Sequence, residues 1–137
     1  MAGYSGTPLP KKLGIKPGAR LALINAPEDF DATLGELPEA VKTRTTARGP
    51  LDVVLYFTTS RAELARRVEG LARALETNGG LWIAWPKRAS GVPTDLDENA
   101  IREIGLAAGL VDNKVCAVDE TWSGLRFVIR LKDRIRR

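Results

Sequence analysis

The fold is indicated most clearly by residues Asp52 to Trp85, which read DVVLYFTTSRAELARRVEGLARALETNGGLWIAW. Its opening, Asp52–Phe57, is an apolar run with the length of a buried strand. Ser60 is a good helix N-cap, and Glu63 three positions later completes a capping box. The closing run, Leu81–Trp85, is apolar at every position, which predicts a strand covered on both faces. Strand, helix and strand in this order predict two parallel strands joined by a right-handed crossover.

The helix between these two strands is predicted to be amphipathic. Leu64, Val68, Leu71 and Leu75 recur at spacings of four, three and four, which places them on one face of a helix. Asn78-Gly79 then predicts the end of the helix, because this pair favours the left-handed conformation that closes helices.

The alternation of strands and helices continues outward in both directions from this unit. Val41–Thr45 alternates β-branched and basic residues, as an edge strand does. The last two strands are joined by a connection that permits only an antiparallel hairpin. We therefore predict an α/β fold with a mostly parallel sheet of about six strands, an antiparallel hairpin at its end and helices on both faces. The remaining predicted elements are strand Arg20–Ile24, helix Glu28–Leu34, helix Asp97–Ala108, strand Lys114–Val118 and strand Leu125–Leu131.

The two ends of the chain are predicted to differ from the centre. Residues 1–16 are rich in glycine, proline and lysine without periodicity, which predicts an N-terminal arm ahead of a single domain at 17–137. The segment Tyr4-Ser5-Gly6-Thr7-Pro8 fits a lid over the sheet edge, a partner contact or simple disorder, and these alternatives stay open. Lys132–Arg137 is a basic tail.

Composition places this chain among ordinary globular domains. Its 137 residues are 44% hydrophobic and 28% charged, which suffices for one domain with a packed core. No apolar run reaches the length of a membrane span. The single cysteine, Cys116, excludes an internal disulfide, favours a reducing cytoplasmic setting and is expected to be a buried, inert thiol.

The absence of histidine excludes several kinds of chemistry. A histidine-based triad is impossible, and with one cysteine an ordinary zinc site is nearly excluded. We expect no metal and no other cofactor. The net charge of +4 permits an acidic partner, but the basic residues are scattered, so nucleic-acid binding is a minor hypothesis.

Five strings of the sequence are uncommon: GYSGTPL (Gly3–Leu9), KLGIK (Lys12–Lys16), GPLDVV (Gly49–Val54), WPKRASGV (Trp85–Val92) and LVDNKVCAVDETWSGLRFV (Leu110–Val128). In these strings the chain resembles a bacterial family of uncharacterised proteins, the domain-of-unknown-function family 3052. This resemblance implies no established activity and transfers no catalytic residues. The element order is also similar to a shortened class I methyltransferase fold, a Rossmann-like sheet that ends in such a hairpin.

Two features that a methyltransferase of this fold would be expected to carry are missing. The turn after the first strand, Ile24–Asp29, reads INAPED and has no glycine to let the backbone approach a cofactor. Pro27 in that turn also lacks an N–H donor. The segment after the second strand, Thr45–Arg48, has no carboxylate for ribose hydroxyls. Both losses argue against ordinary binding of S-adenosylmethionine.

The candidate binding residues lie where the strands end, because open α/β sheets bind ligands beyond the carboxyl ends of their strands. Lys87-Arg88-Ala89-Ser90-Gly91 combines basic side chains with a Ser-Gly turn, a pattern that can hold an anion. The alternatives are that Thr59 and Ser60 only cap a helix, that Trp122 only packs, and that the 87–91 loop is only solvated. The predicted ligand-binding residues are Asn25, Thr58, Thr59, Lys87, Ser90, Glu120 and Trp122.

Three functional hypotheses follow from these patterns. The leading one is a non-catalytic, methyltransferase-like binding or regulatory module that holds a small anionic ligand or a protein partner. The second is an atypical enzyme, dependent on S-adenosylmethionine or another small ligand, in which Lys87 and Glu120 converge in a pocket. The third is a weak nucleic-acid binder that uses the arm, the 87–91 loop and the tail.

Overall fold

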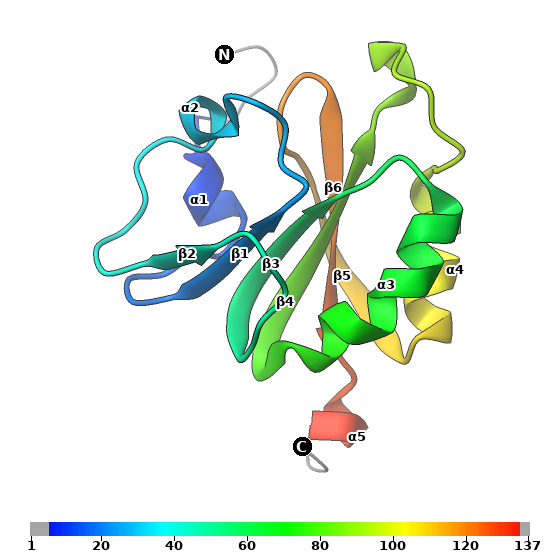
Figure 1. Ribbon diagram of the computed structural model, residues 1–137. Coiled ribbons are helices and arrows are strands. Elements are labelled where there is room, and N and C mark those ends of the chain that lie inside the picture. The colour runs from blue at the N-terminus through cyan, green and yellow to red at the C-terminus, as the bar shows by residue number, and fades with distance from the viewer. Residues whose placement is uncertain (1–5, 135–137) are drawn as a thin grey trace.

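The computed structural model describes residues 6–134, which form one six-stranded sheet with helices on both faces (Figure 1). The sheet order is β2-β1-β3-β4-β6-β5. The elements are α1 (Leu9–Lys12), β1 (Arg20–Ile24), α2 (Phe30–Leu34), β2 (Lys42–Arg44), β3 (Leu51–Phe57), α3 (Arg61–Arg73), β4 (Leu75–Pro86), the 3-10 turn η1 (Arg88–Ser90), α4 (Glu98–Ala107), β5 (Leu110–Ala117), β6 (Trp122–Ile129) and α5 (Leu131–Arg134).

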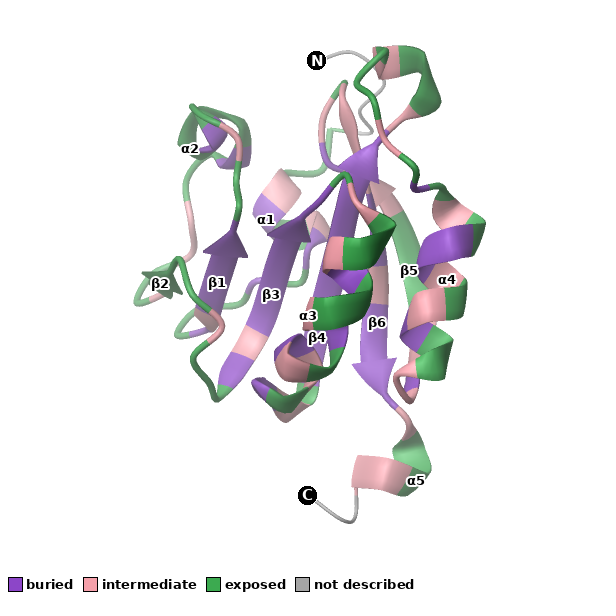
Figure 2. Cartoon of the chain, turned by 45° about the vertical axis from the view of Figure 1, so that its right-hand side comes forward, coloured by how far each residue is buried: buried purple, intermediate pink, exposed green. Residues whose placement is uncertain are grey.

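The strand pairing confirms the predicted topology. β1 pairs in parallel with β2 and β3, and β3 pairs in parallel with β4. β6 runs antiparallel between β4 and β5, which gives the closing hairpin. β2 is the exposed edge strand, as its basic alternating pattern predicts. The carboxyl ends of the parallel strands meet α2, the η1 loop and the β5–β6 turn at one edge (Figure 2).

The sheet divides the apolar side chains into two cores. One face packs against α3 and α4 and includes Tyr56, Trp85 and Phe127. The other face packs against α1, α2 and the segment after α1, with Leu13 and Trp82 fully buried. The Trp82 indole N–H donates to the Leu13 carbonyl oxygen at 3.0 Å, which joins the N-terminal segment to the centre of the sheet.

The prediction for the last turn of the central helix is wrong. α3 ends at Arg73, and Leu75, Asn78 and Gly79 belong to the twelve-residue strand β4. Leu75 pairs with Leu51, and the register then shifts before Val53 meets Gly80. A side chain at Gly79 would lie 2.8 Å from the Leu51 carbonyl oxygen, so the glycine permits this irregular strand start.

Several other boundaries differ from the sequence-based expectations. β5 begins at Leu110 because Gly109, with φ +90°, turns the chain directly out of α4. β6 begins at Trp122, and the chain after Ile129 forms the short helix α5 where a strand end was expected. The expected arm at residues 1–16 contains α1 and the buried residues Leu13 and Ile15, so this part packs against the domain. The predicted lid residues Tyr4 and Ser5 lie outside the described residues, as do Arg136 and Arg137 of the predicted tail.

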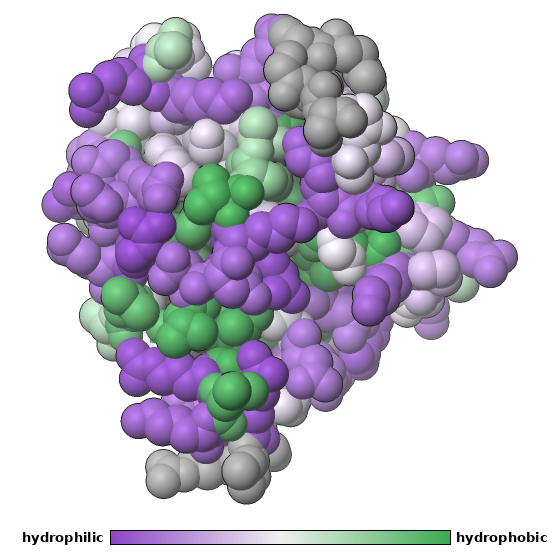
Figure 3. Space-filling model, turned by 180° about the vertical axis from the view of Figure 1, so that it is seen from behind, coloured by the Kyte–Doolittle hydropathy of each residue, from purple (hydrophilic) through white to green (hydrophobic). Residues whose placement is uncertain are grey.

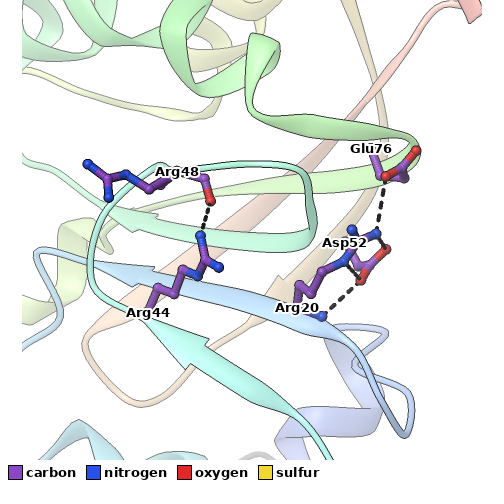
Figure 4. A network of polar contacts seen from close by, with 5 residues as sticks. All are labelled: Arg20, Arg44, Arg48, Asp52 and Glu76. Carbon is purple, nitrogen blue, oxygen red and sulfur yellow. Dashed lines mark hydrogen bonds and ion pairs between the residues drawn. The ribbon is translucent and has the colours of Figure 1, made fainter.

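Near the amino ends of the strands, Arg20 joins three strands through an ion-pair network (Figure 4). Its guanidinium lies 3.0 Å from Asp52 and 3.1 Å from Glu76, and its backbone N–H also donates to Asp52. The Arg20 hydrogen bonds hold the pKa of Asp52 below its ordinary value, although partial burial opposes them. In the same view the Arg44 guanidinium donates to the Arg48 carbonyl oxygen, which steadies the chain after β2.

Candidate binding edge

Asn25 occupies the point where the strand order reverses, between β1 and β3. It follows β1 in the left-handed conformation, with φ +60°, which asparagine tolerates better than most residues. Its side-chain amide donates to the Phe57 carbonyl oxygen at 3.3 Å, at the end of β3. The predicted residues Asn25 and Thr58 therefore come together here, with Asn25 bridging the two strand ends.

The hydroxyl groups after β3 serve the start of α3. Thr58 is buried, and its Oγ1 accepts the Ser60 backbone N–H at 3.2 Å. The Ser60 Oγ accepts the Glu63 N–H at 3.1 Å, so Ser60 caps α3 as predicted. The reciprocal half of the predicted capping box is not formed, because the Ser60 N–H donates to Thr58 and the Glu63 carboxylate accepts the Tyr56 hydroxyl. Thr59 is exposed, and its carbonyl oxygen accepts the Thr94 hydroxyl at 2.7 Å. The capping interpretation of this segment therefore has direct geometric support.

Lys87 connects the end of β4 to the β5–β6 turn. Its ammonium donates to the Asp119 carbonyl oxygen at 2.8 Å, and its backbone N–H donates to the Thr121 carbonyl oxygen at the same distance. The Asp119 carboxylate accepts the N–H groups of Thr121 and Trp122, which fixes the turn. Glu120 is exposed at the tip of this turn. Lys87 thus has a structural bond of its own, directed at the turn backbone.

Ser90 and Trp122 also have local structural partners. The Ser90 hydroxyl donates to the Lys87 carbonyl oxygen at 2.7 Å and accepts the Val92 N–H, which closes the η1 turn. The Trp122 ring lies edge-on to Phe57, with 5.1 Å between ring centroids, and Phe57 makes a similar contact with Phe30. These rings cover the end of the sheet, so the packing interpretation of Trp122 agrees with the geometry.

A buried phenol lies beside this edge, under the first turn of α3. The Tyr56 hydroxyl donates to the Glu63 carboxylate at 2.5 Å, and the Arg67 guanidinium lies 5.2 Å from the ring centroid. Burial, followed by the bond to Glu63, raises the pKa of Tyr56 to about 12. The same hydrogen bond lowers the pKa of Glu63. Because the Tyr56 side chain is inaccessible and stays protonated at neutral pH, we assign this pair a structural role.

A cavity that was not predicted from the sequence lies beyond the end of β4. It has a volume of about 480 Å³ and lies between the η1 loop and the start of α4. Trp85 and Leu96 form its nearly buried apolar part, and Arg88 stands exposed beside them. Only the WPKRASGV string and the anion-binding pattern around Lys87 pointed to this region. The full lining is Trp85, Pro86, Arg88, Gly91, Val92, Pro93, Thr94, Asp95, Leu96 and Asp97.

Other reactive groups offer little chemistry. Burial raises the pKa of the partly buried Cys116 thiol, so the thiol is a poor nucleophile at neutral pH. Across residues 6–134, no cluster of acidic or thiol side chains could hold a metal ion. Within the same range, no helix is both long and apolar enough to cross a membrane.

The profile of a family described as "Protein of unknown function (DUF3052)" matches residues 10–131. This chain belongs to the DUF3052 family. The match confirms the resemblance seen in the sequence strings and covers all six strands of the sheet. No functionally curated protein matches the sequence.

Solved structures show that this DUF3052 protein has a methyltransferase-like fold. An S-adenosylmethionine-dependent methyltransferase from Aquifex aeolicus aligns with a TM-score of 0.64 and 16% identity, over 88% of this chain and 87% of that one. The magnesium protoporphyrin IX methyltransferase of Synechocystis PCC 6803, with bound S-adenosylhomocysteine, aligns at 0.56 and 14%, over 83% and 75%. Aeropyrum pernix fibrillarin, with natively bound S-adenosylmethionine, aligns at 0.56 and 14%, over 92% and 70%. At this level of identity the likeness concerns the fold alone.

The residues of this chain do not fit the cofactor that these neighbours bind. The turn after β1 has a bridging asparagine and Pro27 in place of glycines, and α2 after it is only five residues long. β2 ends at Arg44, and the exposed Thr45 and Thr46 that follow carry no carboxylate for ribose. A dinucleotide or nucleoside cofactor at this position needs close backbone approach and an acidic partner. We therefore derive no reaction step through S-adenosylmethionine.

Proposed function

We propose that this DUF3052 protein is a non-catalytic binding module that holds a small anionic ligand or an acidic protein segment at the carboxyl edge of its sheet. One observation carries the proposal. Asn25 bridges the strand ends where a cofactor would lie, while a separate cavity of about 480 Å³ lies beyond β4. The proposal includes a cytoplasmic location, which the single cysteine favours.

Three charged side chains line the cavity, Arg88, Asp95 and Asp97, and the two acids are already bound at helix starts. The Asp95 carboxylate accepts the Arg61 N–H at the start of α3, and the Asp97 carboxylate accepts the Ala100 N–H in α4. Both acids therefore serve as helix caps, where the helix dipoles stabilise their charge. The Arg88 side chain has no hydrogen bond or ion pair with any described residue and remains available for a ligand.

The apolar part of the cavity adds a second requirement. Trp85 and Leu96 are nearly buried, while Val92 is 38% exposed at the rim. A ligand with an apolar body and a carboxylate would place its body against these side chains and its charge near Arg88. An acidic peptide with a neighbouring apolar side chain has the same chemistry.

The test begins with calorimetric titration of the full chain by S-adenosylmethionine and S-adenosylhomocysteine. We expect no heat of binding at millimolar ligand. Micromolar affinity for either compound would overturn the non-catalytic assignment. The same protein, labelled with ¹⁵N, is then titrated with benzoate, and the Trp85 indole N–H is expected to shift in wild type and not in Arg88→Gln. Arg44→Gln, on the edge strand β2, is the charge-matched control.

The alternative enzyme hypothesis finds less support in the contacts. It requires Lys87 and Glu120 to converge on a ligand, whereas the Lys87 ammonium donates to the Asp119 carbonyl oxygen and Glu120 is exposed at the turn. The bond from Lys87 supports a structural role for this lysine.

A further inference from the structure

A second cavity lies near the other end of the strands, on the face opposite α3 and α4. Its volume is about 320 Å³. Its walls are the loop that leads into β1, the start of β3, Asn78 in β4 and Arg126 in β6. Figure 3 shows the molecule from this side, where hydrophilic side chains run between apolar patches. The lining residues are Gly14, Lys16, Pro17, Gly18, Ala19, Asp52, Val53, Asn78 and Arg126.

The Arg126 guanidinium occupies space that is open because Gly80 has no side chain. It pairs with Trp82 of β4 and Lys114 of β5 across the sheet. Its guanidinium lies over Gly80, where a Cβ atom would come within 2.7 Å of the Arg126 Cζ atom. Any residue other than glycine at position 80 would therefore displace the guanidinium. The Asn78-Gly79-Gly80 segment thus has a second role beyond the irregular start of β4.

The Arg126 charge has no acidic partner in residues 6–134. Its guanidinium makes a long hydrogen bond, 3.4 Å, to the Asn113 amide oxygen. Burial lowers the pKa of Arg126, and the nearby positive charge of Arg134 lowers it further. The cavity does include Asp52, but Arg20 binds both oxygens of that carboxylate. A half-buried guanidinium without a counter-ion is costly. An ionisable group that is perturbed by burial and lines a cavity is a candidate for a ligand site.

We propose that this cavity binds the phosphoryl group of a small molecule, with Arg126 as its main anchor. Lys16 and Asn78 also line the cavity and carry further donors, so donors from the loop, β4 and β6 surround one space. Donors on several sides suit a tetrahedral phosphoryl group, whereas a planar carboxylate is satisfied by the guanidinium fork alone. The site is separate from the cavity beyond β4 and independent of the function proposed there.

The experiment uses the full chain labelled with ¹⁵N and titrated with inorganic phosphate and pyrophosphate at constant ionic strength. We expect saturable shifts at the Arg126 Nε–H and at the backbone amides of Asn78 and Gly80. Arg126→Gln should weaken pyrophosphate binding roughly tenfold to a hundredfold, the effect of losing a charged hydrogen-bond donor. Gly80→Ala keeps every charge and should also weaken binding, because it moves the guanidinium. Lys42→Gln, on the exposed edge strand β2, removes the same charge and should bind like wild type.

Two results would overturn this proposal. One is the absence of saturable shifts at these positions with both phosphate and pyrophosphate. The other is saturable binding of a short single-stranded oligonucleotide at Arg126 while both small probes fail, which would make the site a nucleic-acid contact. If Arg88→Gln loses benzoate binding and keeps phosphate binding, the two sites are independent. The same conclusion follows if Arg126→Gln loses phosphate binding and keeps benzoate binding.

Discussion

Two arginines on opposite faces of the same sheet differ in the charges that surround them. Arg20 lies on the face that α3 and α4 cover, and two carboxylates bind its guanidinium at 3.0 and 3.1 Å. Arg126 lies on the other face, over Gly80, and among the described residues its guanidinium hydrogen-bonds only to the Asn113 amide oxygen. Arg20 ties together three strands, whereas Arg126 adds nothing comparable to the fold. The difference separates a structural cation from a candidate binding group.

Among these substitutions, removal of the Asp52 carboxylate that pairs with Arg20 should lower the thermal stability most. Asp52→Ala deletes three acceptor contacts to Arg20, one of them from its backbone N–H. Because the Asp52 side chain is 35% exposed, solvent screens part of this loss. We expect the Tm to fall by roughly 3–6 °C in calorimetric melts. Asp133→Ala in the short helix α5 is the matched control, and an equal fall in both variants would contradict a special role for the network.

The pH dependence of stability should show that the negative charge of Asp52 is the source of this stabilisation. The folded-state pKa of Asp52 is lowered, so its contribution is present above the unfolded-state value of about 4 and is lost as the pH falls through the folded-state pKa. The free energy of unfolding of wild type should therefore exceed that of Asp52→Ala at pH 7, and the gap should narrow progressively as the pH falls below about 4. Urea titrations at several pH values measure this gap. A gap that stays constant down to pH 3 would show that the carboxylate charge is not its source.

Substitution of Gly80, which lies beneath the Arg126 guanidinium, should lower the stability by an intermediate amount. Gly80→Ala introduces a Cβ atom into the space that the guanidinium occupies. The obstacle is the far end of a flexible side chain, so the cost should be about 1 kcal/mol, the low end of overpacking. Urea unfolding measures the cost. In the double variant Gly80→Ala with Arg126→Ala the penalty should largely disappear, and a penalty that persists would assign it to the strand backbone instead.

Much of this fold follows from local patterns in the sequence. The apolar runs at Asp52–Phe57 and Leu81–Trp85 and the Ser60 cap mark their elements because strand burial and capping depend on nearby residues. The start of β4 was missed because Asn78-Gly79 suits both a helix end and an irregular strand. Only the close approach of the Leu51 carbonyl oxygen, which lies far away in the sequence, decides between them.

The arrangement of residues at the carboxyl edge of the sheet was predictable in outline but not in detail. The rule for open α/β sheets locates Asn25, Thr58 and Lys87 near one another, and their binding role remains a prediction. It does not foresee that a side-chain amide bridges β1 and β3, or that the Lys87 ammonium binds the turn backbone. Arg126 gave no local signal at all, because its lack of a carboxylate and its place over Gly80 are properties of the folded sheet.

Removing the Arg126 charge should have the smallest effect on stability, and this small effect is the most informative. Arg126→Met keeps an apolar stem over Gly80 and leaves no carboxylate without a partner, since none contacts Arg126 among the described residues. The substitution also relieves the burial of an uncompensated charge and its repulsion with Arg134. Replacing a buried charge by an apolar side chain is often neutral or stabilising, so we expect an unchanged or slightly higher Tm without ligand. Arg20→Met, measured beside it, should lower the Tm because Asp52 and Glu76 would lose their partner. If Arg126→Met instead destabilised the protein as much as Arg20→Met, Arg126 would be a structural cation too, and the case for a ligand at the second cavity would lose its main support.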